Sequence, residues 1–147
     1  MLNNIAMKDN PRVSIVSSCY NHGKYIREML DSVFAQTFTD YEVIIVNDGS
    51  MDGTREILEG IVDDRVRMLH MENKGSAMAL NRGIREARSP LILNLNADDK
   101  IAPNLLEKAV AIFDKHANSG IVHSDVRFFG ARAGRFELPP IPMSRCL

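Results

Sequence analysis

The stretch Leu91-Ile-Leu-Asn-Leu-Asn-Ala-Asp-Asp99 decides how the chain is interpreted. It begins as a short apolar segment, introduced by Ser89-Pro90, and ends in two adjacent carboxylates. Such a segment is typical of a parallel strand that is buried on both faces. Two neighbouring acids at its end repel each other unless a positive partner lies between them. We therefore expect Asp98 and Asp99 to meet a divalent cation with a diphosphate; the alternative is that they only form a turn before the next helix.

The composition is that of an ordinary globular protein with one core. The chain has 147 residues, of which 45% are hydrophobic and 25% charged, and its net charge is −1,. No concentrated basic region is present, so nucleic-acid binding is not expected. No apolar run is long enough to span a membrane. Cys19 and Cys146 are far apart and have no metal-like spacing. We therefore expect the protein to be in the reducing cytoplasm, with association at the inner face of the membrane as an alternative.

Hydrophobic periodicity predicts strands and helices in alternation. Strands are predicted at residues 13–16, 41–46, 65–70, 91–95 and 121–129, and helices at 25–34, 52–59, 76–87 and 103–120, with Asp52 or Thr54 capping the second helix,. This alternation predicts right-handed crossovers and a doubly wound, Rossmann-like, mostly parallel α/β sheet with helices on both faces. We expect a flexible leader at residues 1–10, a domain at 11–130 and an irregular tail at 131–147.

Three polar strand ends are brought together by this topology. In a Rossmann-type sheet the first four strands take the order 3-2-1-4, and ligands bind at the carboxyl ends near the switch between strands 1 and 4. Residues 18–21, 47–50 and 96–99 follow the first, second and fourth predicted strands. They are scattered in the sequence, and we expect them to converge on one ligand site.

Two of these ends carry groups that suit a nucleotide. Tyr20 offers a ring on which a base can stack, and its alternative role is packing at the rim of the core. Asp48 can accept a hydrogen bond from a base N–H or a ribose hydroxyl, and its alternative role is helix capping. Neither a P-loop nor a Gly-x-Gly-x-x-Gly motif is present, so a diphosphate would need carboxylate-held Mg²⁺ or Mn²⁺ to neutralise its charge,.

A series of short motifs runs from Pro11 to about Gly130. In order, they are Pro11-Arg-Val-Ser-Ile-Val16, Tyr20-Asn21, Gln36-Thr-Phe38, Tyr41-Glu-Val-Ile-Ile-Val-Asn-Asp-Gly-Ser50, Asp52-Gly-Thr54, Asn73-x-Gly75, Ala79-x-Asn81-x-Gly83, and Ala97-Asp-Asp99 with Pro103. This series resembles the beginning of an inverting family 2 glycosyltransferase. The resemblance implies a GT-A fold, a nucleotide-diphospho-sugar donor (commonly a UDP-sugar), a divalent metal, a saccharide or lipid-linked acceptor of unknown identity, and a role in cell-envelope polysaccharide synthesis.

The same resemblance implies which residues form the site. The nucleotide-binding residues would be Tyr20, Asn21, Asp48, Gly49, Asn96 and Asp98, and the metal ligands would be Asp98 and Asp99. Many relatives carry an Asp where this chain has Asn96, whose amide can hydrogen-bond ribose or offer its oxygen to a metal but supplies no charge. Lys74 and Arg82 can help to neutralise phosphate, and their alternative role is that of solvated cations on a helix surface.

The general base is the part of the family pattern that this sequence does not supply. The resemblance places it well beyond the metal motif, and the only acids after the predicted fourth helix, Asp125 and Glu137, lie in contexts that do not suggest the role. We therefore expect mainly the donor-binding half of a transferase, with an inactive nucleotide-binding module or a structural remnant as alternatives. The family's sheet has a later strand beside residues 91–95, so we expect this open edge to produce a homo-oligomer.

Overall fold

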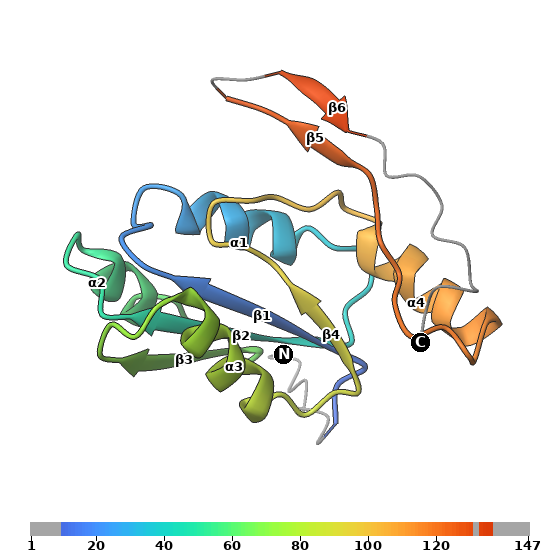
Figure 1. Cartoon of the computed structure of the whole chain (residues 1–147), viewed down its shortest axis with the longest axis horizontal. Coiled ribbons are helices and arrows are strands. Elements are labelled where there is room, and N and C mark those ends of the chain that lie inside the picture. The colour runs from blue at the N-terminus through green and yellow to red at the C-terminus, as the bar shows by residue number, and fades with distance from the viewer. Residues whose placement is uncertain (1–9, 131–132, 137–147) are drawn as a thin grey trace, which may run out of the picture. The chain divides into compact units, whose positions relative to one another are not determined.

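Figure 1 presents the computed structural model of the chain, which describes residues 10–130 and 133–136. The chain divides into two compact units, Met1–Glu107 and Lys108–Leu147. The predicted leader at 1–10 and tail at 131–147 lie mostly outside the described residues. Within the described residues, no helix combines the length and apolar character needed to cross a bilayer.

The first unit is built on a four-stranded parallel sheet. Its strands are β1 (Val13–Cys19), β2 (Tyr41–Asp48), β3 (Val66–Met71) and β4 (Leu91–Asn94). They lie in the order β3-β2-β1-β4, and every neighbouring pair is parallel. This is the strand order that the alternating pattern predicts, and the doubly wound α/β fold is confirmed.

Helices cover both faces of this sheet, as predicted. Helices α1 (Ile26–Phe34) and α2 (Thr54–Glu59) lie on one face, and α3 (Ser76–Glu86) lies on the other (Figure 1). This placement follows from right-handed crossovers, because the chain moves outward along the sheet through α1 and α2 and returns through α3. Gly83 lets α3 approach closely, since a Cβ there would lie 2.4 Å from Cγ1 of Val16.

Three local predictions for the first unit are wrong. Strand β4 is not buried on both faces: Ile92 and Asn94 are exposed, because α3 packs mainly against β1 and β2 and β4 is an end strand of the sheet. The cap of α2 is Gly53 rather than Asp52 or Thr54. The helix predicted from residue 25 begins at Ile26, and Tyr25 is its N-cap, with a side chain that is 43% exposed.

The chain after Glu107 differs more from the prediction. Helix α4 (Leu105–Lys115) ends five residues before Gly120, and a turn from Ser119 N–H to the His116 carbonyl follows it. The strand predicted at 121–129 is reduced to β5 (Val126–Phe128), because polar residues at 123–125 interrupt the apolar run. Strand β5 pairs antiparallel with β6 (Gly134–Phe136), which the sequence analysis did not predict.

Candidate functional site

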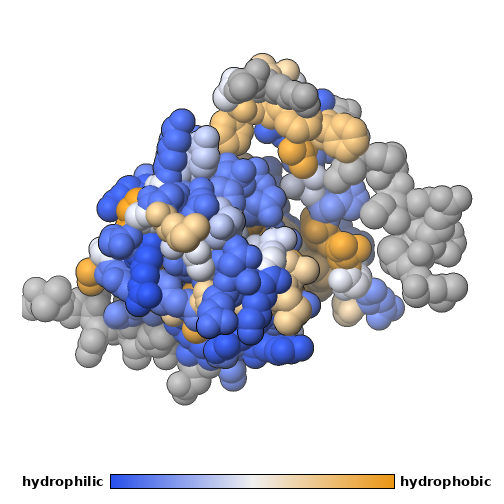
Figure 2. Space-filling view, turned by 60° about the vertical axis from the view of Figure 1, so that its left-hand side comes forward, coloured by the Kyte–Doolittle hydropathy of each residue, from blue (hydrophilic) through white to orange (hydrophobic). Residues whose placement is uncertain are grey.

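A cavity of about 290 Å³ opens at the carboxyl ends of the strands in the first unit. Its walls come from the ends of β1 and β2, from the chain that follows β1 and β4, and from the start of α3. The lining residues are Ser18, Cys19, Tyr20, His22, Asp48, Ser76, Asn96, Ala97 and Asp98. Figure 2 turns this end of the sheet toward the viewer, and the surface there is mostly hydrophilic. The three polar strand ends therefore meet at one cavity.

Asp48 ties the end of β2 to the start of α3. Its side chain is 2% exposed, its Oδ1 accepts a hydrogen bond from the Lys74 backbone N–H at 2.8 Å, and its Oδ2 accepts one from the Gly75 backbone N–H at 2.9 Å. Gly75 is the residue at the N-cap of α3. These bonds hold the turn that precedes α3 rather than the first N–H groups of the helix itself, and the same carboxylate also lines the cavity.

Asn21 and Gly49 shape the loops behind the cavity and are not among its lining residues. Asn21 adopts a left-handed conformation with φ 57°, and its side-chain carbonyl accepts a hydrogen bond from the Met51 N–H at 2.9 Å. Its own N–H donates to Ser50 Oγ at 2.9 Å. Gly49 has φ 74°, and a Cβ there would lie 2.9 Å from the backbone nitrogen of Asn73. Both residues hold the β1 and β2 loops in place.

Tyr20 and His22 form the wall that follows β1. Tyr20 is 41% exposed, so its ring is accessible to a ligand, as stacking requires. The Tyr20 N–H donates to Nδ1 of His22 at 3.3 Å, which leaves the hydrogen of this imidazole, when neutral, on Nε2,. The His22 carbonyl accepts hydrogen bonds from Tyr25 and Ile26 at the start of α1. Helix α1 therefore fixes the position of this wall.

The acidic wall follows β4. Asp98 lines the cavity, and Asp99 lies next to it; both are exposed. The side-chain Nδ2 of Asn96 donates to Oδ2 of Asp99 at 2.8 Å, and the Asp99 N–H donates to the Asn96 carbonyl at 3.1 Å. The turn role that the sequence left open is therefore present, and it still leaves the Asp98 carboxylate at the cavity.

The acidic wall fits only one kind of metal site. Among the described residues, no group of three or more His, Cys, Asp or Glu side chains is placed to enclose an ion. Mg²⁺ in nucleotide sites is usually held by one or two carboxylates plus phosphate oxygens and water. Asp98 and Asp99 supply oxygen donors of this kind, so the chain fits a cation whose shell a ligand diphosphate completes.

Cys19 lies at the inner side of the cavity and is only 2% exposed. Burial, together with the carboxylates of Asp52 and Asp48, raises the pKa of its thiol to about 12. The thiolate is the nucleophilic form of cysteine. Cys19 is consequently a packing residue, and its thiol stays protonated at neutral pH.

Lys74 and Arg82, the two basic side chains that could neutralise phosphate, do not line the cavity. Arg82 is 3.4 Å from Glu86 one helical turn away, which is the surface role that the sequence left open. Lys74 is exposed, and its backbone rather than its ammonium group is tied to the site through Asp48. His22 and Ser76 are lining residues that the sequence analysis did not single out; their positions just after β1 and at the start of α3 were the available signal.

The comparison with protein families identifies the family of the chain. The model of the family "Glycosyl transferase family 2" matches residues 14–141. The chain belongs to this family. Among curated relatives, an uncharacterized glycosyltransferase of Rickettsia bellii is 40% identical over 113 residues, which is 76% of this chain and 16% of that protein. The glycosyltransferase GlyG of Streptococcus pneumoniae is 41% identical over 98 residues, covering 65% of this chain and 33% of that one.

Solved structures confirm the GT-A type of fold. S. aureus TarS, crystallised with UDP-GlcNAc, superposes with a TM-score of 0.68 at 30% identity, covering 72% of this chain and 32% of TarS. A mannosyltransferase from Pyrobaculum calidifontis, solved in complex with GDP-Man and Mn²⁺, has a TM-score of 0.63 at 30% identity, covering 71% of this chain and 32% of the other. This family 2 chain thus spans about a third or less of the length of the relatives described here.

Proposed function

We propose that this chain is the donor-binding half of an inverting glycosyltransferase that moves a sugar from a nucleotide-diphospho-sugar to a saccharide or lipid-linked acceptor. The observation that carries the proposal is the cavity in which Tyr20, Asp48 and Asp98 come from three separate strand ends. Such convergence at the switch point of a parallel sheet is the usual place of a nucleotide. Membership of glycosyl transferase family 2 supports the sugar-transfer chemistry.

Each residue that the sequence assigns to nucleotide binding has a role in this proposal. The Tyr20 ring stacks on the base, and Asp48, already held by two backbone N–H groups, accepts from a base N–H or a ribose hydroxyl. Asn96 and Asp98 lie toward the ribose and the diphosphate. Asn21 and Gly49 contribute by holding the loops that bear these groups. We propose a UDP-sugar first, because TarS binds UDP-GlcNAc, and a GDP-sugar second, because the mannosyltransferase binds GDP-Man.

A divalent cation, Mn²⁺ or Mg²⁺, belongs to the same proposal. Asp98 and Asp99 would hold it, and when bound it neutralises the diphosphate charge, which helps the nucleotide to leave. The protein's own contribution is to keep two carboxylates adjacent at the cavity edge, with the Asn96 amide bonded to one of them. Mn²⁺ in the related mannosyltransferase supports this assignment.

Calorimetric titration of UDP, GDP and dTDP, with and without Mn²⁺, tests the proposal. We expect at least one diphosphate to bind, and Asp99→Ala to weaken the metal-dependent part, since loss of a charged partner in such a site costs about 2–5 kcal/mol. The matched control is Asp114→Ala, which removes an acid of α4 outside the cavity. Equal affinity with EDTA and with Mn²⁺ would rule out the metal, and no binding of any nucleotide would rule out the function.

A nucleotide-binding module without turnover is the second candidate. Inverting transfer needs a base that deprotonates the acceptor hydroxyl. In the described part of the second unit, the acid singled out by the sequence, Asp125, is bonded to Arg135 at 2.6 Å. We therefore expect the 147-residue chain to bind its donor but to hydrolyse or transfer the sugar very slowly. Rapid release of nucleotide diphosphate by the purified chain would contradict this expectation.

We also propose that the protein is cytoplasmic and that it associates with itself. Within the described residues, β4 pairs only with β1, so its other edge has no strand partner. Open edges pair readily with other chains, and charged residues on them prevent this. Light scattering should therefore show a dimer or larger species that Ile92→Lys reduces and Val62→Lys, at a residue 98% exposed, does not. A monomer at high concentration would refute the expectation.

A further inference from the structure

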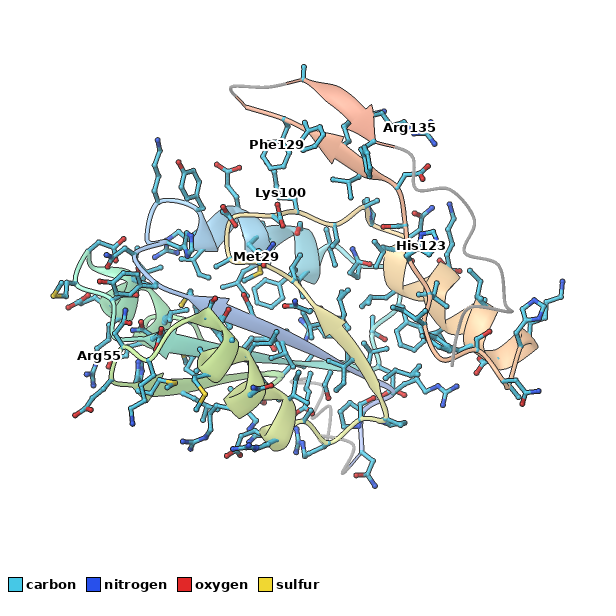
Figure 3. The ribbon with its side chains drawn as sticks, in the orientation of Figure 1. Met29, Arg55, Lys100, His123, Phe129 and Arg135 are labelled. Atoms are coloured by element: carbon cyan, nitrogen blue, oxygen red, sulfur yellow. The ribbon has the colours of Figure 1, made fainter. Side chains whose placement is uncertain are left out.

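The segment behind the acidic wall runs along helix α1. The four residues that follow Asp99 each contact α1 or the turn after it. Their partners follow one another along the chain in the same order, so the segment runs parallel to the helix. Lys100 Nζ is 2.7 Å from Glu28 Oε2, and the Ile101 N–H donates to Ser32 Oγ at 3.2 Å. Figure 3 labels Lys100 on this segment and Met29 on the helix. The acidic pair is thus attached to the helix whose start fixes Tyr20 and His22.

Gln36 makes the central contacts of this attachment. Its Nε2 donates to the Ala102 carbonyl at 2.7 Å and to the Ser32 carbonyl at 3.1 Å, and its Oε1 accepts from the Leu106 N–H at 3.1 Å. The side chain is 5% exposed, so water cannot replace these bonds easily,. Next to it, the Thr37 N–H donates to the Pro103 carbonyl at 2.8 Å. One amide therefore joins the end of α1 to the chain on both sides of Pro103.

We propose that Gln36 is a positioning residue for the carboxylates of Asp98 and Asp99. This inference rests on the proposed function, because it assumes that the pair receives a metal–diphosphate ligand. Ala102 follows Asp99 by three residues, so a displacement of its carbonyl moves the turn that bears the acids. A binding group must keep its place to within about 0.5 Å to work well. The Gln36-Thr-Phe38 motif, to which the cavity gives no role, acquires one in this way.

The direct test replaces the amide without adding charge. Gln36→Met keeps a similar volume and removes all three hydrogen bonds. The matched control, Tyr41→Phe, removes the bond from the Tyr41 hydroxyl to the Val33 carbonyl of the same helix, at 3.0 Å, and the acceptor of Arg65 Nη1, at 2.8 Å. It removes no bond of Gln36 to the segment from Lys100 to Leu106. Both variants are titrated with UDP plus Mn²⁺ and, separately, with uridine without metal.

The two ligands separate positioning from general damage. We expect Gln36→Met to weaken the Mn²⁺-dependent binding of UDP about tenfold or more, as loss of partners behind metal ligands commonly does, while uridine affinity changes less than about twofold. Tyr41→Phe should change neither. Equal losses for UDP and uridine would overturn the proposal, and so would an unchanged metal dependence.

Amide hydrogen exchange on the unliganded chain gives an independent measurement. Gln36→Met should speed exchange at residues 96–102 and leave Lys74 and Gly75, held by Asp48, as in the wild type. If Gln36→Met does not fold, Ser32→Ala, which removes the acceptor of the Ile101 N–H, is compared in the same way. No local change at residues 96–102 would overturn the proposal. If the wild type binds no nucleotide, the proposed function fails and this exchange pattern alone decides whether Gln36 positions the acidic turn.

Discussion

The side-chain amide of Asn96 donates a hydrogen bond to the carboxylate of Asp99 at 2.8 Å. This neutral donor lets two acids remain adjacent without a third charge. The bond holds the acidic turn in shape before any ligand arrives. The Asn96 amide therefore stabilises the turn, but it adds no negative charge that could attract a cation.

Asn96→Asp should reverse this balance. The new carboxylate loses the bond to Asp99 and repels it, but it adds a charge close to the proposed cation. We expect the ratio of UDP affinity with Mn²⁺ to that without it to rise at least about tenfold, since a pair of unit charges about 4 Å apart near a protein surface is worth several kcal/mol. Calorimetry measures both affinities. Asn94→Asp, at an exposed residue outside the cavity, is the control and should leave the ratio unchanged; a lower ratio for Asn96→Asp would contradict the prediction.

Asp48→Asn should reduce both stability and binding. An amide cannot accept hydrogen bonds at both of its atoms, so the N–H of either Lys74 or Gly75 loses its acceptor. Leaving one such group unpaired costs about 1–3 kcal/mol in the free energy of unfolding, which urea denaturation measures. Asp98→Asn, at an exposed residue of the same cavity, should weaken UDP binding and leave the unfolding free energy unchanged. Equal stability of the two variants would refute the structural role of Asp48.

The sequence predicts the sheet and its ligand edge because both follow from short-range patterns. Apolar runs such as Tyr41–Asp48 end in polar residues, and the chirality of crossovers then determines the strand order,. The prediction of a strand at residues 121–129 is wrong for a related reason. An apolar run indicates a strand but not its partner, and here a turn at Gly130, with φ 82°, pairs Val126–Phe128 with the chain that follows rather than with the main sheet.

Side-chain partners between distant segments lie beyond sequence reasoning. Gln36 reaches residues 66 and 70 positions along the chain, and nothing near it in the sequence marks those partners. The position of Asp48 at the end of an apolar run predicts that it lies at the ligand edge, but its bonds to the turn before α3 depend on how two loops meet in space. Residue types at strand ends are therefore predictable, whereas the contacts that fix their positions are not.

Gly83→Ala should destabilise the protein although Gly83 lies in a helix. Alanine in place of an exposed helical glycine gains about 1 kcal/mol. At this position the added Cβ would lie 2.4 Å from Cγ1 of Val16 and 3.2 Å from Cγ2 of Val46, so α3 must move away from the sheet. Overpacking of this kind costs about 1–3 kcal/mol. Urea denaturation should show a net loss, whereas Gly120→Ala, where a Cβ meets nothing within 4 Å, should show none.

Glu42 gives the fold a dependence on acid that can be located in one cluster. The side chain is 1% exposed and accepts hydrogen bonds from Ser14 Oγ at 2.7 Å and from the Arg88 N–H at 2.8 Å; Arg88 Nη2 is 2.9 Å away. Burial alone raises the pKa of Glu42, but the bonds from Arg88 and Ser14 outweigh it and hold the pKa below the ordinary 4.5. This cluster contributes no residue to the cavity and acts only on stability.

The sign of this dependence follows from the lowered pKa. A carboxyl group whose pKa is lower when folded contributes stability that is complete above its unfolded pKa, here 4.5, and is lost as the pH falls through the folded value,. Glu42→Gln should therefore lower the unfolding free energy at neutral pH and flatten its decline below pH 4.5. Ser14→Ala, which removes one bond to the carboxylate, should produce the same change to a smaller extent. Denaturation midpoints from neutral pH to about pH 3 measure both, and an equally steep acid decline in Glu42→Gln would assign the effect to other carboxylates.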